Sequence, residues 1–217
     1  MGSTKSSRLD LVQRPMPHWG LWVWFRYNRA HAVYLLTKVK DVNLFKLIKF
    51  LELISTRKGV IPHKLFNEGK SIRVTKLATE RKYEVEVNES RFREIITNYR
   101  KDGLTGHNSA LIPILENDYH SLAIEVPLWV EKLNFKGKWL TVTGHIDLLQ
   151  YDENEKVIWI WDYKPEPEKE PKVGDQVLLY KYMLTLMTDV EYEKIRVGWF
   201  NEKVEYIIKD NKIFPFK

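Results

Sequence analysis

Three consecutive segments rich in β-branched and aromatic residues constrain the fold of this chain more than any other feature. They span residues 122–130, 139–151 and 157–163. Polar turns at 134–137 and 152–155 separate them, which is the pattern of antiparallel strands joined by hairpins. The sequence therefore predicts a three-stranded β-meander in the second half of the chain.

The segments that follow the meander predict an α/β arrangement. Three prolines in 165–171 remove backbone donors, so this stretch cannot continue a central strand and is expected to be a loop. A helix is predicted over 175–188, and the segments 196–201, 204–209 and 212–216 are typical of short strands.

The first hundred residues predict helices. Apolar residues recur at three- and four-residue spacing over 19–39 and 42–54, the period of an amphipathic helix. A proline suits the first helical turn, so a helix is expected over 62–77, and another over 90–101. Four tryptophans are expected in the core: Trp22, Trp24, Trp159 and Trp161.

The chain shows no internal repeat and no linker. We therefore expect a single α/β domain over 1–217, with a helical N-terminal region at 1–58 and the core at 59–217. The most apolar early stretch, 19–36, contains charged and polar residues that are too costly for a membrane span. We expect an intracellular protein with no membrane partner.

The amino-acid composition excludes several kinds of functional site and indicates the charge of a binding partner. The chain has no cysteine, which excludes disulfides, thiolate zinc sites, a cysteine nucleophile and a cysteine-ligated iron–sulfur cluster. Residues 1–100 hold 20 Lys and Arg against 9 Asp and Glu, a net charge of +11, while residues 101–217 hold 15 and 20, a net charge of −5. A basic half suits a polyanionic partner such as DNA, although uneven charge is also common on solvated surfaces.

One predicted hairpin carries three charged residues in an apolar setting. If 152–155 form its loop, Asp147 lies opposite Ile160, and Asp162 is its diagonal neighbour on the same face. Lys164 shares that face by the period of two. Asp147 could instead be a lone strand-end residue, and Asp162 could pair only with Lys164. Buried acids are costly unless they are paired or bind a metal, so the combination favours a functional site.

These residues occur in an ordered set of motifs. Gly-x-x-Asp ending at Asp147, Asp-x-Lys ending at Lys164 and Gln176-x-x-x-Tyr180 resemble the motifs of the PD-(D/E)XK nuclease superfamily, in its RecB-like branch. That branch includes the CRISPR-associated RecB-like exonucleases. Gly-x-x-x-His ending at His63 resembles a further branch motif, as does Glu125 on the preceding strand. The resemblance covers roughly residues 59–182, and the chain lacks the cysteines of the iron–sulfur members.

The resemblance implies a restriction-endonuclease-like αβββαβ core, with a central mixed β-sheet flanked by helices. It implies Mg²⁺ as cofactor, with Mn²⁺ able to substitute, held by Asp147, Asp162 and the backbone carbonyl of Tyr163. His63 would complete the site, with Glu68 as its substitute, and a histidine near a helix start can also be purely structural. Glu125 is a possible additional acid.

Three further residues have catalytic roles in this interpretation. Lys164 would orient or deprotonate the attacking water, and Gln176 and Tyr180 would lie one helical turn apart beside it. Tyr180 could equally be a packing residue of a buried helix. DNA contacts are expected from Lys70, Arg73 and Lys76, which would share one face of the predicted helix unless that face is merely solvated.

The resemblance implies a metal-dependent deoxyribonuclease acting in DNA replication, recombination or repair. A structure-specific endonuclease of the Holliday-junction type is an alternative to an exonuclease, and a homodimer would suit such a substrate. The sequence also leaves open a non-cleaving DNA-binding module in an assembly and an RNA- or nucleotide-processing factor. The chain is also similar to stand-alone nucleases of archaeal spindle-shaped viruses (fuselloviruses), for which the location would be the host cytoplasm.

Overall fold

The computed structural model describes residues 10–56, 59–67, 69–100, 103, 106–210 and 212–213. Its strands are β1 (Leu11–His18), β2 (Leu21–Asn28), β3 (Ile72–Arg73), β4 (Val85–Glu89), β5 (Ser121–Phe135), β6 (Lys138–Asp152), β7 (Val157–Tyr163), β8 (Ile195–Phe200) and β9 (Val204–Ile208). Its α-helices are α1 (Arg29–Lys38), α2 (Val42–Thr56), α3 (Val74–Leu77), α4 (Arg93–Asn98), α5 (Asn108–Asn117) and α6 (Val173–Thr188). Short 3₁₀ helices are η2 (His63–Phe66), η3 (Pro167–Lys169) and η4 (Tyr192–Lys194).

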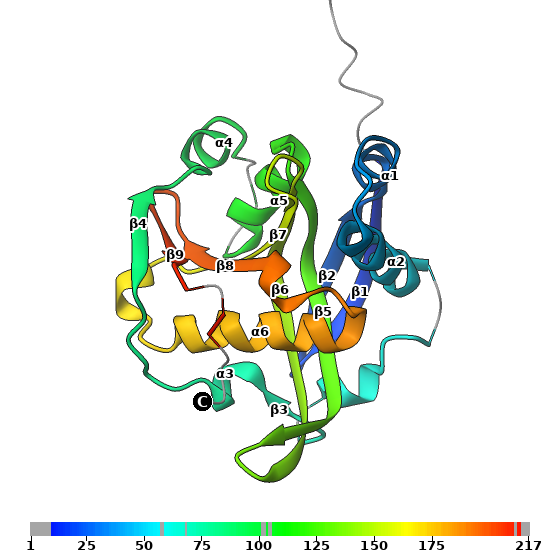
Figure 1. Ribbon diagram of the computed structural model, residues 1–217, viewed down its shortest axis with the longest axis vertical. Coiled ribbons are helices and arrows are strands. Elements are labelled where there is room, and N and C mark those ends of the chain that lie inside the picture. The colour runs from blue at the N-terminus through cyan, green and yellow to red at the C-terminus, as the bar shows by residue number, and fades with distance from the viewer. Residues whose placement is uncertain are drawn as a thin grey trace, which may run out of the picture.

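One mixed sheet organises the molecule (Figure 1). Its strand order is β1-β2-β5-β6-β7-β8-β9-β4, and β3 pairs with β6 outside this path. The meander β5-β6-β7 is antiparallel as predicted, and α6 crosses over to β8, which pairs with β7 in parallel. The predicted fold class, a mixed sheet flanked by helices, is confirmed. Among the described residues, no helix is long and apolar enough to cross a membrane.

Side chains of β7 alternate between two apolar clusters on opposite faces of the sheet. Ile158 and Ile160 belong to a cluster that includes the buried residues of α2 and α6, which we call the α6-side cluster. Trp159 and Trp161 belong to a cluster with residues of α4 and α5, the α5-side cluster. Because both faces are covered, β7 is buried along its whole length, which explains its nearly continuous apolar sequence.

The register predicted for the β6-β7 hairpin is wrong by one loop position. Leu149 pairs with Ile160, and the last hairpin pair is Asp152 with Val157. The side chain of Asp152 accepts hydrogen bonds from the two amides at 154 and 155, and Lys156 adopts a left-handed φ of 54°. These features move the loop to 153–156. The one-position shift changes partner numbers by two, so it keeps every side chain on its predicted face.

The predicted helix over 19–39 is wrong in its first half. A β-hairpin, β1-β2, occupies this region, and a helix begins only at Arg29. Trp19 and Gly20 form the two-residue turn with φ of 50° and 88°, the geometry that favours hairpins. Trp22 and Trp24 are 67% and 44% exposed, so the prediction that they lie in the core is also wrong. Trp159 and Trp161 are buried, as predicted, and the second predicted helix is confirmed as α2.

The predicted helix over 62–77 is replaced by η2, β3 and α3. Gly69 has a left-handed φ of 74°, and β3 forms parallel pairs with β6 that a continuous helix would forbid. Lys70, Arg73 and Lys76 therefore lie in a turn, a strand and a short helix, and do not share one helical face.

The remaining predicted elements have mixed outcomes. The helix predicted over 90–101 is reduced to α4, and residues 101 and 102 lie outside the described residues. The helix predicted after the proline-rich loop is confirmed as α6, and the loop itself contains η3. Strands β8 and β9 are confirmed, and most of the strand predicted over 212–216 lies outside the described residues.

A buried lysine on α6 predicts a pH-dependent stability. Lys181 is fully buried, with its ammonium nitrogen 3.9 Å from the centre of the Tyr192 ring. Burial lowers the pKa of Lys181 from 10.5 to about 7. Between these values the unfolded chain binds a proton that the folded chain lacks, so the free energy of unfolding rises with pH.

We expect this effect to disappear in Lys181→Met. The unfolding free energy of the wild type minus that of the variant should increase by up to about 1.4 kcal/mol per pH unit between about pH 7 and pH 10. Urea unfolding of both proteins at several pH values measures it. Other titrating groups cancel in the difference, so a pH-independent difference would contradict the expectation.

Candidate active site

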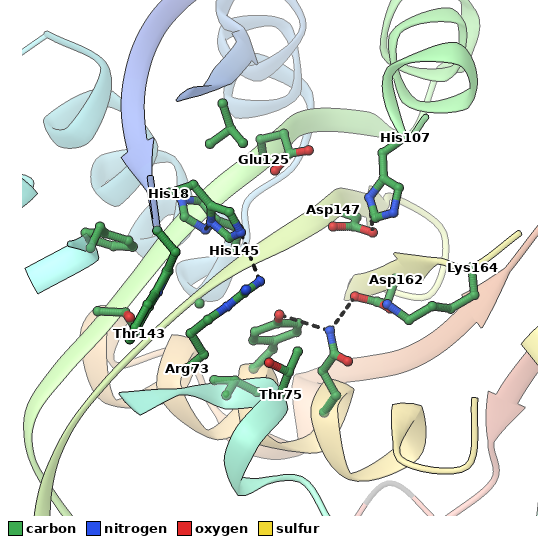
Figure 2. Close-up of a pocket in the computed structure, with 17 residues that line it drawn as sticks. His18, Arg73, Thr75, His107, Glu125, Thr143, His145, Asp147, Asp162 and Lys164 are labelled. Atoms are coloured by element: carbon green, nitrogen blue, oxygen red, sulfur yellow. Dashed lines mark hydrogen bonds and ion pairs between the residues drawn. The ribbon is translucent and has the colours of Figure 1, made fainter. Parts of the chain in front are cut away.

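A pocket lies where the central strands meet the first turns of α6 (Figure 2). Its walls come from segments far apart in the sequence: the β1-β2 turn, η2, β3, α3, the start of α5, the three meander strands and α6. The polar and charged residues that line it are His18, Arg73, Thr75, His107, Glu125, Thr143, His145, Asp147, Asp162, Lys164 and Gln176. The predicted catalytic residues are therefore brought together with Glu125 and Arg73, and with side chains that the sequence did not single out.

Asp147 and Asp162 meet where β6 and β7 separate. The last pair of these strands is Leu148 with Trp161, so the two acids lie one position beyond it. One carboxylate oxygen of Asp147 accepts a hydrogen bond from the backbone amide of Tyr163 at 2.8 Å. Both acids are almost completely buried, at 6% and 1% exposed. Both side chains lie in the same pocket, as expected for two residues on the same face of the predicted hairpin.

Lys164 pairs with Asp162. The ammonium nitrogen lies 2.5 Å from Oδ2 of Asp162, and the lysine side chain is 14% exposed. Burial by itself would lower the pKa of Lys164, but the nearby Asp162 and Asp147 raise it above the ordinary value. The lysine is therefore held in its charged form beside the acids.

Helix α6 presents Gln176 and Tyr180 to the same pocket. The amide nitrogen of Gln176 donates to Oδ1 of Asp162 at 2.9 Å and to the Tyr180 hydroxyl at 3.1 Å. Asp175 fixes the helix in place, because its carboxylate accepts a hydrogen bond from the backbone amide of Thr79 at 2.9 Å. Gln176 thus connects the helix to Asp162 and links Tyr180 to the same acid.

His107, Glu125 and Asp147 form the cluster best placed to hold a metal ion. One ligand atom from each lies within 4.8 Å of the others. Nδ1 of His107 is 3.2 Å from Oδ2 of Asp147. Asp162 is turned towards Lys164 and is not part of this cluster. The backbone of Tyr163 contacts the site through its amide, and its carbonyl remains a predicted ligand.

The charge balance of these groups fits a cation. Burial, and then the charge of Asp147, raise the pKa of Glu125 to about 8 and that of Asp162 to about 7. The hydrogen bond with Asp147 raises the pKa of His107 to about 9, so a proton on this imidazole partly neutralises the acids. Burial would also raise the pKa of Asp147, but His107 and Lys164 lower it below its ordinary value. At neutral pH the metal-free site therefore keeps protons on Glu125 and His107. A divalent cation would take the place of these protons, since nitrogen and carboxylate ligands bind a metal in their deprotonated form.

Glu125 has a strained backbone. It lies inside β5 with a left-handed φ of 53°, a conformation that costs about 1–3 kcal/mol for a residue other than glycine. Ile124 packs in the α5-side cluster and Val126 in the α6-side cluster, although side chains two apart on a regular strand share a face. The kink therefore breaks the strand's alternation at the residue whose carboxylate lines the pocket. Such strain is typical of functional positions.

His107 was missed by the sequence reasoning, although a signal for it exists. The Gly-x-x-x-His spacing occurs twice, ending at His63 and again at His107. Both glycines near the second copy, Gly103 and Gly106, have positive φ, and His107 immediately precedes α5. The spacing alone could not distinguish the two copies.

His63 is placed elsewhere. It begins η2 and is not among the residues that line the pocket, and burial lowers its pKa. Its proposed substitute, Glu68, lies outside the described residues. Lys70 and Lys76 are exposed and do not line the pocket, whereas Arg73 does. Lys76 and Arg73 both approach the ring of Trp19, at 5.5 and 5.9 Å from its centre.

A steric constraint explains why glycine occupies the first position of the Gly-x-x-Asp motif. A Cβ atom at Gly144 would lie 2.5 Å from the Tyr180 ring and 3.1 Å from Val74. Gly144→Ala is therefore expected to displace Tyr180, weaken its hydrogen bond with Gln176 and destabilise the fold by about 1–3 kcal/mol. Chemical denaturation measures this cost.

A double variant tests the cause. If the clash with the ring is responsible, Gly144→Ala combined with Tyr180→Leu should cost less stability than the sum of the two single variants. Additive costs would show that Gly144 acts through something other than this contact.

The mixed sheet and its acid-and-lysine pocket define a protein of the restriction-endonuclease-like class. Residues 51–213 match the family model described as the PD-(D/E)XK nuclease superfamily, and the chain belongs to that superfamily. Membership implies a metal-dependent nuclease, hence a hydrolase, with DNA as its substrate. Among solved structures, the crystal structure of SSO0001 is similar, with 15% sequence identity, a TM-score of 0.37, and coverage of 82% of this chain and 80% of that chain. No curated protein matches the chain.

Proposed function

We propose that this chain is a Mg²⁺-dependent deoxyribonuclease that hydrolyses DNA phosphodiester bonds at the pocket described above. The observation that carries the proposal is the convergence of three carboxylates, the imidazole of His107 and one charged lysine on a single pocket. The chain lacks cysteine, so every ligand would be a nitrogen or an oxygen, and Mn²⁺ would substitute for Mg²⁺.

His107, Glu125 and Asp147 would hold the metal, with Asp162 and the backbone carbonyl of Tyr163 as further ligands. The bound ion would supply a Lewis acid for the phosphate and lower the pKa of the attacking water. This assignment replaces His63 with His107, because only His107 lies with the acids. Burial and the mutual repulsion of the carboxylates, which raise the pKa of Glu125 and Asp162, give the reason for metal binding.

Lys164 would stabilise negative charge on the phosphate and orient the attacking water. Its raised pKa favours this electrostatic role over proton abstraction, because the ammonium group holds its proton at neutral pH. Gln176 would be a positioning residue, since its amide fixes the orientation of the Asp162 carboxylate. Tyr180 would act through its hydrogen bond with Gln176.

We also propose a branch, a domain organisation and a cellular role, which superfamily membership by itself does not give. The motifs favour the RecB-like branch and a role in DNA replication, recombination or repair. The absence of a repeat or linker favours a single nuclease domain over 1–217, and we propose an intracellular location. The size, the composition and the missing cysteines favour an archaeal spindle-shaped virus as the source. The basic first hundred residues would bind the DNA backbone. An exonuclease and a junction-cleaving endonuclease acting as a homodimer share this site chemistry, and a non-cleaving module would not need the complete set of acids and lysine.

The test incubates the purified protein with labelled linear duplex, single-stranded, flap and four-way-junction DNA. Each substrate is tested with Mg²⁺, with Mn²⁺ and with chelator, and gel filtration gives the oligomeric state. We expect cleavage with either metal and none with chelator, and the cleaved substrate distinguishes exonuclease from endonuclease. Cleavage that persists in chelator would overturn the proposed mechanism, and metal-independent binding without cleavage would favour the non-cleaving module.

A further inference from the structure

Arg73 lies on the wall of the pocket opposite the acids (Figure 2). It ends β3, whose parallel pairing with β6 sets it beside Thr143. Among the residues that the structure describes, no carboxylate forms an ion pair with its guanidinium, although Glu125, Asp147 and Asp162 line the same pocket. A guanidinium in a pocket without an acidic partner has hydrogen-bond donors available for an anion.

A pair of histidines fixes this arginine. One terminal nitrogen of Arg73 lies 3.0 Å from Nε2 of His18, and Nδ1 of His18 lies 2.8 Å from Nδ1 of His145. A guanidinium can only donate, so Nε2 of His18 must accept. The proton of a neutral His18 is then on Nδ1 and is donated to His145, which carries its own proton on Nε2.

The arrangement has a cost that a purely structural contact would not explain. His145 is 4% exposed, and its Nε2 has no hydrogen-bond partner within the described ranges. Burial and the charge of Arg73 lower the pKa of His18 to about 4, so its ring is neutral and can accept at pH 7. The chain therefore leaves one buried donor unsatisfied while it directs a single guanidinium into the pocket.

Resting on the function proposed above, we propose that Arg73, held by His18 and His145, binds a non-bridging oxygen of the phosphate next to the scissile one. The guanidinium is the binding group, and His18 is a positioning residue that acts through it. Lys164 and the metal held by the acids on the facing wall would bind the scissile phosphate, so the two walls would contact successive phosphates of one strand. The hairpin turn that carries His18 is fixed to η2 by the backbone bond from Trp19 to Phe66, at 2.9 Å.

The first experiment uses single phosphates made neutral. After the cleavage position of the wild type is mapped with Mg²⁺, a methylphosphonate is placed on either side of the scissile phosphate. We expect one of the two to raise KM about 10- to 100-fold in the wild type, with kcat nearly unchanged. Arg73→Gln should show a similar rise in KM on normal DNA and no further rise with that methylphosphonate. If each methylphosphonate raises the KM of Arg73→Gln as much as it raises the KM of the wild type, the proposed subsite is wrong.

The second experiment does not depend on cleavage. Binding of the same DNA in chelator is measured against salt concentration for the wild type, Arg73→Gln and a matched control, Lys156→Gln. The control removes an exposed charge in the β6-β7 loop of the acidic half, away from the pocket. Loss of one phosphate contact should reduce the slope of log Kd against log salt by about 1 in Arg73→Gln. The control should retain the wild-type slope, and an unchanged slope in Arg73→Gln would refute the subsite even if the protein cleaves DNA. A wild type that binds but never cleaves would refute the nuclease proposal alone.

Variants of His18 separate positioning from folding. His18→Gln keeps an oxygen that can accept from Arg73 and should stay within about 3-fold of the wild-type KM, whereas His18→Leu should raise KM about 10-fold. Thermal unfolding of both shows whether they are folded. Equal KM values for these two variants would exclude His18 as the positioning residue.

Discussion

Asp162→Asn is expected to abolish cleavage while leaving the fold intact. Metal-ion catalysis contributes several kcal/mol of transition-state stabilisation, so loss of a ligand should reduce kcat on the order of 10³-fold. The asparagine side chain has nearly the same shape, and its carbonyl oxygen can still accept the hydrogen bond from Gln176 that Asp162 accepts at 2.9 Å. Single-turnover cleavage with saturating Mg²⁺ measures the loss.

The same variant should gain less thermal stability from Mg²⁺ than the wild type does. Burial and the charge of Asp147 raise the pKa of Asp162 to about 7, so its negative charge is unfavourable in the metal-free protein. The asparagine removes that charge but also leaves the largely buried Lys164 ammonium without its carboxylate, and these two effects on the free energy of unfolding oppose one another. Mg²⁺ should then raise the Tm of the wild type more than that of the variant, because a ligand stabilises only the state that binds it. A cleavage rate within tenfold of the wild-type rate would contradict the assignment of Asp162 as a metal ligand.

His107→Ala should reduce cleavage at least about 100-fold, whereas His63→Ala should leave it within about 3-fold. The reason is position: Nδ1 of His107 lies 3.2 Å from the Asp147 carboxylate, and His63 does not line the pocket. The loss in His107→Ala should shrink when Mg²⁺ or Mn²⁺ is raised, since a missing ligand weakens metal affinity. Titration of the metal in the cleavage assay measures this.

The two histidine variants control one another, because both remove a partly buried imidazole near a glycine-containing turn. Thermal unfolding of each gives its cost in stability. Should His63→Ala lose activity and metal affinity while His107→Ala keeps both, the site would have to be rebuilt around η2.

The structure also changes the interpretation of the aromatic residues. Trp22 and Trp24 occupy the outer face of β2, because β1-β2 is a hairpin with alternating faces and not a helix. Residues 21–25 form an uninterrupted apolar run, which is compatible with a strand as well as with a helix. The three- and four-residue spacings that favoured a helix are present as well, and periodicity by itself does not decide between them.

The sequence by itself determined the meander and the helix that follows it, and the resemblance of its motifs singled out the acids, the lysine and the Gln-x-x-x-Tyr pair. These features depend on short-range rules: side chains alternate along a strand, turns are polar, and residues four apart share a helical face. The one-position error in the hairpin loop changed the strand partners by two residues, so each side chain stayed on its predicted face. The predicted residues therefore still lie in one pocket.

Tertiary structure alone decided which Gly-x-x-x-His places its imidazole beside Asp147 and that a left-handed backbone turns Glu125 into the pocket. It also decided that Arg73 lines the same pocket in contact with His18. Each depends on contacts between segments tens of residues apart, such as β3 with β6. Such contacts form because the whole sheet closes around its two apolar faces, and no local pattern of residues encodes which distant partner a strand end will meet.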